Sequence, residues 1–79
     1  MNKENGITLV LEAVARALQR YDIGNIDVVG IEEENTIDIY YSGRHNSYPI
    51  ESEVVKYEDV DIDALERELD ARNVGYWWS

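Results

Sequence analysis

The sequence predicts an α+β fold in which a helix, a three-stranded antiparallel β-meander and a second helix follow one another, with both helices on one face of the sheet. Three observations predict this order. Apolar residues recur at helical spacing near both ends of the chain and alternate with polar residues between them. The connections between the predicted strands are short, which favours antiparallel pairing. We expect a single compact domain over residues 1–79, with an aromatic C-terminal tail at residues 76–79.

The first predicted helix lies in the N-terminal quarter of the chain. Asn5 or Thr8 is expected to cap its start. Gly24 is expected to end it in the left-handed conformation. We expect this helix to cover the sheet with an apolar stripe at three- and four-residue intervals, consisting of Ile7, Val10, Leu11, Val14, Leu18 and Tyr21.

Three segments in the middle of the chain favour strands. Residues 26–31 are rich in β-branched side chains and residues 36–41 alternate in polarity, so we expect a hairpin with an acidic turn between them. Residues 48–57 form the third predicted strand, after a polar loop. Pro49 has no amide N–H and belongs at an edge or at the start of that strand. The apolar phase changes along it, which a bulge near Ser52 would explain.

The second predicted helix follows an acidic run. Asp59 or Asp61 is expected to cap it, and the buried positions are 62, 65 and 69. Asp59, Asp61 and Asp63 also have the spacing that opens a calcium loop. The sixth and twelfth positions of such a loop would be an alanine and an aspartate, where a glycine and a glutamate are needed. A capped helix is therefore the favoured interpretation, and we expect no metal and no cofactor.

An enzyme is not expected from this sequence. His45 is the only imidazole; it lies in a polar loop beside Arg44, and the chain has no cysteine to pair with it. Acid–base chemistry by two carboxylates requires a desolvated cleft, for which a domain of this size has little room. The absence of cysteine also excludes disulfides and thiolate zinc sites, and it favours a cytoplasmic location. The apolar run after residue 4 is too short and too charged for a signal sequence or a membrane span.

The dominant chemical signal is negative charge. Seventeen acidic residues against seven basic ones give a net charge of −10. The charge is uneven, because residues 51–70 hold nine carboxylates against Lys56 and Arg67, whereas residues 1–20 carry a net charge of +1. Such a charge argues against direct binding to nucleic acid or to an anionic membrane, and it favours a cationic partner. The alternative is a solvated acidic face that only keeps the protein soluble.

Regularly spaced carboxylates can imitate the phosphates of DNA. Acids two residues apart on a strand are ~6.6–6.8 Å apart, and acids three or four apart on a helix lie on one face. Tyr40, Tyr48 and Trp77 are expected to add apolar anchors to the contact. The acids expected to bind the partner are Glu32, Glu33, Glu34, Asp38, Glu51, Glu53, Glu58, Asp59, Asp61, Asp63, Glu66 and Asp70.

In size, charge, lack of cysteine and compact α/β pattern, the chain resembles the small acidic proteins with which phages oppose host defence, namely anti-CRISPR inhibitors and anti-restriction proteins that imitate nucleic acid. The resemblance covers the whole chain, contains no motif and transfers no individual site residue. It implies a stoichiometric inhibitor in the host cell cytoplasm. Such an inhibitor occupies a basic groove of a crRNA-guided surveillance complex or of another nucleic-acid enzyme and blocks target DNA.

A second interpretation concerns the aromatic tail. Tyr76, Trp77 and Trp78 offer more aromatic area than a free terminus normally exposes, so the tail either folds back on the core or docks on a partner. In the second case the protein is a homodimer or larger homo-oligomer with a structural or regulatory role, joined through this tail. The acids would then serve solubility alone.

Overall fold

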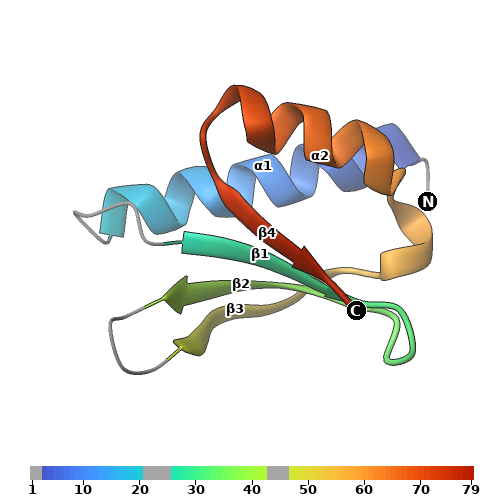
Figure 1. Ribbon diagram of the computed structural model, residues 1–79, viewed down its shortest axis with the longest axis horizontal. Coiled ribbons are helices and arrows are strands. Elements are labelled where there is room, and N and C mark those ends of the chain that lie inside the picture. Colours follow the sequence, from blue (N-terminus) through green and yellow to red (C-terminus); the bar gives the residue numbers. More distant parts are fainter. Residues whose placement is uncertain (1–2, 21–25, 43–46) are drawn as a thin grey trace.

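The computed structural model describes residues 3–20, 26–42 and 47–79. Its strands form one sheet in the order β3-β2-β1-β4, and both helices lie on the same side of it (Figure 1). The expected α+β class is confirmed. The elements in chain order are α1 (Lys3–Arg20), β1 (Ile26–Ile31), β2 (Thr36–Ser42), β3 (Ser47–Val55), the 3-10 helix η1 (Tyr57–Asp59), α2 (Ile62–Ala71) and β4 (Gly75–Trp78).

The three-stranded antiparallel meander is wrong, as is the expectation that a helix is the last element. β1, β2 and β3 pair antiparallel as expected, but β4 adds a fourth strand that runs parallel to β1, with Trp77 opposite Val29. Four aromatic-rich residues are too few to show the alternation by which a strand is recognised in a sequence. A parallel pair also needs a long crossover, here supplied by β2, β3 and α2 together.

The connection from α2 to β4 explains why the tail returns to the sheet. Asn73 adopts a positive φ of 59°, a conformation that asparagine tolerates better than most residues. The next amide, of Val74, donates to the carbonyl oxygen of Leu69 at 2.9 Å and closes the helix end. The chain therefore reverses at once and enters β4.

α1 begins earlier than expected. Asn5 and Thr8, the expected caps, both lie inside the helix, and the Thr8 hydroxyl donates to the carbonyl oxygen of Glu4 at 3.2 Å. Gly24, the expected end, lies outside the described residues, as does Tyr21. Leu18, expected in the apolar stripe, is 42% exposed. The buried face of α1 includes smaller residues than expected, and these let the helix axis lie close to the elements packed against it. The buried residues of α1 are Gly6, Val10, Ala13, Val14 and Ala17.

One hydrophobic core fills the space between the sheet and the two helices. Leu65 and Leu69 of α2 are fully buried, as the helical spacing predicted, and Ile62 packs at the margin of the core. The helix-facing side of the sheet contributes Ile26, Val28, Ile37, Ile39 and Val55. Side chains alternate along a strand, so the neighbouring residues point to the opposite face, which neither helix covers (Figure 1).

The bulge expected near Ser52 is present. Ile37 pairs with Val55 and Ile39 pairs with Glu51, so three residues of β3 lie opposite a single residue of β2. In the middle of this bulge Glu53 adopts a positive φ of 51°. β3 ends at Val55, two residues before the expected end, because the chain turns into η1.

Candidate functional site

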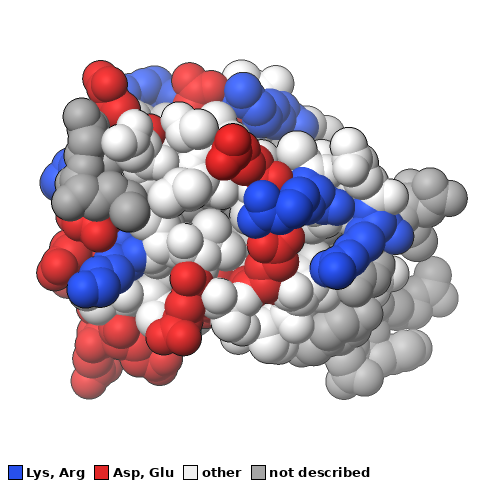
Figure 2. All heavy atoms as spheres, turned by 180° about the vertical axis from the view of Figure 1, so that it is seen from behind, with Lys and Arg blue, Asp and Glu red and all other residues white. Residues whose placement is uncertain are grey.

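Six carboxylates gather where the β1–β2 turn, the bulge of β3 and η1 meet. The turn and η1 lie at the same end of the sheet, on the right in Figure 1. Figure 2 shows Asp and Glu side chains at this end, at the lower left of the view from behind. Lys and Arg side chains also lie on that face, so it is the local density of acids that distinguishes this end. The acidic end, as we call it, consists of Glu32, Glu33, Glu34, Glu53, Glu58 and Asp59.

The β1–β2 turn holds its three glutamates on a well-defined backbone. The amide of Asn35 donates to the carbonyl oxygen of Glu32 at 3.0 Å, and Asn35 has a positive φ of 57°. The amide of Glu32 donates to the carbonyl oxygen of Ser79 at 3.1 Å, which ties the turn to the end of β4. Glu33 and Glu34 are exposed, like Glu32. The turn therefore presents three carboxylates to solvent without being loose itself.

Two side chains of the hairpin fix the other acidic segments. The Asn35 side-chain oxygen accepts a hydrogen bond from the amide of Glu58 at 2.9 Å and ties η1 to the turn. The Asp38 carboxylate, 9% exposed, accepts one from the amide of Glu53 at 2.6 Å and ties the bulge to β2. Asp38 was expected to contact a partner, but the structure gives it this internal acceptor role. The role of Asn35 was not predicted, although an asparagine after an acidic run is typical of turns.

A pocket of about 410 Å³ opens between these segments. Among the described residues that line it, Glu34, Glu53 and Asp59 are carboxylates and Lys56 is the one base. The negative potential of such a pocket attracts cationic groups. In the described part of the chain, no three histidine, aspartate or glutamate side chains form a group that could hold a metal ion.

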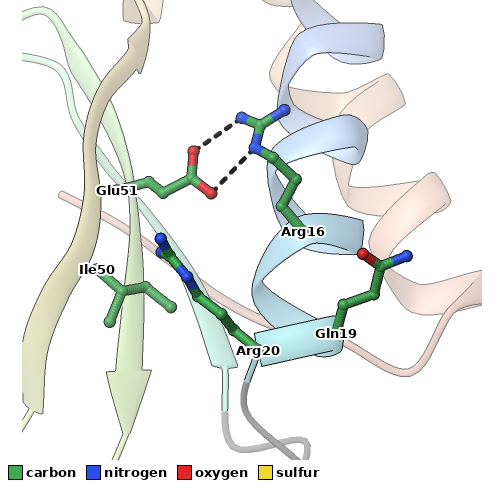
Figure 3. Close-up of a pocket in the computed structure, with 5 residues that line it drawn as sticks. All are labelled: Arg16, Gln19, Arg20, Ile50 and Glu51. Atoms are coloured by element: carbon green, nitrogen blue, oxygen red, sulfur yellow. Dashed lines mark hydrogen bonds and ion pairs between the residues drawn. The ribbon is translucent and has the colours of Figure 1, made fainter.

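Glu51 does not belong to the acidic end. Its carboxylate accepts two hydrogen bonds from Arg16 of α1, at 2.7 Å from Nη2 and at 3.2 Å from Nε (Figure 3). This hydrogen bond raises the pKa of Arg16 above its ordinary value. The bulge separates Glu51 from Glu53, so the two acids, only two residues apart, serve different sites.

Asp61 is the N-cap of α2. Its carboxylate accepts a hydrogen bond from the amide of Ala64 at 3.2 Å, so the capped-helix interpretation of this acidic run is confirmed. Asp59 is the last residue of η1 and lines the pocket at the acidic end. Asp63 lies exposed in the first turn of α2. Of these three acids, the structure therefore brings only Asp59 into the acidic end.

Glu66 and Asp70 face β4 and bind its aromatic side chains. The Trp78 indole N–H donates to Glu66 at 2.5 Å, and the Tyr76 hydroxyl donates to Asp70 at 3.3 Å. The bond to Asp70 is the main cause that raises the pKa of Tyr76 above its ordinary value. Both acids were expected to bind a partner, but the structure uses them to hold β4 against α2.

The aromatic tail divides between the two faces of the sheet. Tyr76 and Trp78 stack with ring centroids 5.3 Å apart and pack against the core, so the tail folds back as one of the two expectations had it. Trp77 points to the helix-free face and is 58% exposed. Tyr40 lies on that same face and is partly buried. The side chain of Tyr48 lies outside the described residues.

No known protein family, curated protein or solved structure matches this chain. Neither helix in the described ranges has the length and apolar character that crossing a membrane requires.

Proposed function

We propose that the protein is a stoichiometric inhibitor that binds a basic nucleic-acid-binding groove of another protein through its acidic end. By occupying the groove, it blocks target DNA, as anti-CRISPR and anti-restriction proteins do. The observation that supports this proposal is a pocket lined by one carboxylate from each of three separate segments, Glu34, Glu53 and Asp59, with Lys56 the one base among the described lining residues. Glu32, Glu33 and Glu58 are neighbours of these acids in the same segments and are exposed.

Rigidity makes these carboxylates suited to imitate phosphates. A groove that binds DNA presents Lys and Arg side chains to closely spaced oxyanions. Binding to it costs less entropy when the backbone that carries the carboxylates is already ordered. At the acidic end, hydrogen bonds to Asp38, Asn35 and Ser79 hold the backbone of the bulge, η1 and the turn. The net charge of −10 adds long-range attraction, which speeds association with a basic partner.

Trp77 is an exposed apolar anchor near the acidic end. It lies two residues before Ser79, whose carbonyl oxygen accepts the amide of Glu32. Charge mainly sets the rate of encounter, whereas buried aromatic side chains hold a complex together. A partner that covers the β1–β2 turn would reach Trp77 on the helix-free face with the same contact.

The test is inhibition of target-DNA binding in mobility-shift assays with a panel of crRNA-guided surveillance complexes and restriction enzymes. The wild-type protein, added before the DNA, should prevent binding by at least one of them at a molar ratio near one. The Glu33→Lys, Glu53→Lys variant should fail against that same enzyme. The matched control is Glu12→Lys, Glu68→Lys, which changes the net charge equally on exposed helical positions and should still inhibit. Lack of inhibition by the wild type against every enzyme would refute the proposal.

The exposure of Trp77 favours a second candidate, a homo-oligomeric structural or regulatory module. Because Tyr76 and Trp78 pack inward, such an assembly would use Trp77 and the adjacent helix-free face in place of the whole tail. Light scattering coupled to size exclusion separates the two functions. A dimer that the Trp77→Ala substitution converts to a monomer, with no inhibition of any nucleic-acid enzyme, would establish this second candidate.

A further inference from the structure

A second pocket, of about 580 Å³, opens between α1 and β3. Its polar side chains come mainly from the last two turns of α1, where positions 16, 19 and 20 share one helix face. α1 ends on the left in Figure 1, at the opposite end of the sheet from the acidic end. The lining residues are Arg16, Gln19, Arg20, Ile50 and Glu51 (Figure 3).

The charges of this pocket are only partly balanced. Arg16 and Glu51 neutralise each other through their two hydrogen bonds. The Arg20 side chain has no hydrogen bond and no ion pair in the part of the chain that the structure describes, and it is exposed. The lining residues therefore carry one uncompensated positive charge, on a side chain that is free to bind.

Figure 3 shows the Arg20 guanidinium between α1 and β3, beside the Arg16–Glu51 pair and above Ile50. A guanidinium presents parallel N–H groups whose spacing matches the two oxygens of a carboxylate. Arg16 uses Nε and Nη2 for Glu51, which leaves its third nitrogen as a further donor. The partly buried Ile50 offers an apolar wall beside these donors.

We propose that this pocket binds a carboxylate group of an acidic peptide, with Arg20 as the residue that holds it. One positive charge matches one carboxylate. A phosphate dianion fits less well, because Glu51 and the negative end of the α1 dipole both repel additional negative charge. The site is independent of the proposed function, since none of its residues belongs to the acidic end.

The test is a titration of the ¹⁵N-labelled protein, followed by NMR, with an acetylated and amidated Leu-Glu-Leu peptide. The backbone amides of residues 16–20, 50 and 51 and the Arg20 side-chain N–H should shift in a saturable way. The Leu-Gln-Leu peptide should not shift them. Arg20→Gln should weaken binding about tenfold, the loss expected for one charge-assisted hydrogen-bonded contact. Arg67→Gln, an exposed arginine of α2, is the matched control and should leave binding unchanged.

Two small anions complete the test. Acetate should shift the same signals more weakly, because the carboxylate is retained and the apolar contact to Ile50 is lost. Inorganic phosphate should shift them less than the Leu-Glu-Leu peptide does. The proposal is overturned if phosphate binds more tightly than this peptide, if the glutamine peptide binds equally well, or if the two arginine variants lose binding to the same degree.

Discussion

The buried carboxylate of Asp38 accepts a hydrogen bond from the backbone amide of Glu53 at 2.6 Å, across the bulge of β3. Glu53 holds a left-handed backbone conformation there, with a φ of 51°. A residue other than glycine adopts this backbone conformation only when its surroundings compensate for the strain. The position of one carboxylate of the acidic end thus depends on a residue that is itself almost inaccessible to a partner.

Replacing Asp38 should therefore destabilise the fold. Asp38→Ala removes the acceptor and leaves the amide of Glu53 unpaired, and the expected loss is about 1–3 kcal/mol in the free energy of unfolding. Asp38→Asn keeps an acceptor oxygen and should lose less. Urea denaturation followed by tryptophan fluorescence measures both. An alanine variant as stable as the wild type would show that the hydrogen bond does not hold the bulge.

Replacing Glu53 by glycine or by alanine should weaken partner binding equally but change the stability of the fold to different degrees. Glycine adopts the left-handed conformation without strain, so this variant should be more stable than Glu53→Ala by about 1 kcal/mol. Both variants lack the same carboxylate of the acidic end, and both should bind a basic partner more weakly than the wild type. Thermal unfolding compares their stabilities. Equal melting temperatures for the glycine and alanine variants would contradict the strain at this position.

Gly6→Ala should destabilise the protein although it lies within a helix, where this substitution ordinarily stabilises by about 1 kcal/mol. An added Cβ would clash with the carbonyl oxygen of Asp59 and lie 2.9 Å from the Cγ2 atom of Val60. We expect a loss of about 1–3 kcal/mol, as in other overpacked sites. Asn5→Ala, at the neighbouring exposed position, is the control and should not destabilise. Chemical denaturation of the two variants shows whether Gly6→Ala lowers the free energy of unfolding, as we expect, or raises it.

The phenol of Tyr76 should titrate above the ordinary value of 10.0, because its hydrogen bond to Asp70 favours the protonated form. Since the pKa is raised in the folded state, the stability from this bond is fully present below pH 10. It is lost as the pH rises through the folded-state pKa. The difference in absorbance at 295 nm between the wild type and Tyr76→Phe isolates this titration. Asp70→Asn should move it downward, and titration at or below pH 10 in the wild type would contradict the contact.

The sequence predicted those elements whose apolar spacing, turn residues or capping residues lie within a single short stretch of the chain. The α1 helix, the hairpin of β1 and β2, the bulge of β3 and the Asp61 cap all follow from residues near one another in the chain. β4 was not predicted, because its four residues carry no periodicity and its position depends on pairing with β1, more than 45 residues earlier. The stripe of α1 was right where Val10 and Val14 are buried, but Gly6, Ala13 and Ala17 were missed because larger side chains outweighed them.

The candidate site was predicted only in part, for a similar reason. The acids of the turn and of η1 form runs in the sequence, so local reasoning could group them as candidates. Which acids serve the fold could not be predicted, because that depends on long-range contacts. Glu51 meets Arg16 from 35 positions away, and Glu66 meets Trp78 only because the chain reverses after α2.

The central claim is that the acidic end occupies a surface that DNA would otherwise bind. The most direct measurement is a pull-down from cells that express nucleic-acid-handling complexes, repeated with competing duplex DNA, for the wild type and the two charge-reversed variants. We predict that the wild type and Glu12→Lys, Glu68→Lys capture the same basic complex, that DNA displaces both, and that Glu33→Lys, Glu53→Lys captures none. Equal capture by all three proteins, or capture that DNA leaves unchanged, would contradict the claim.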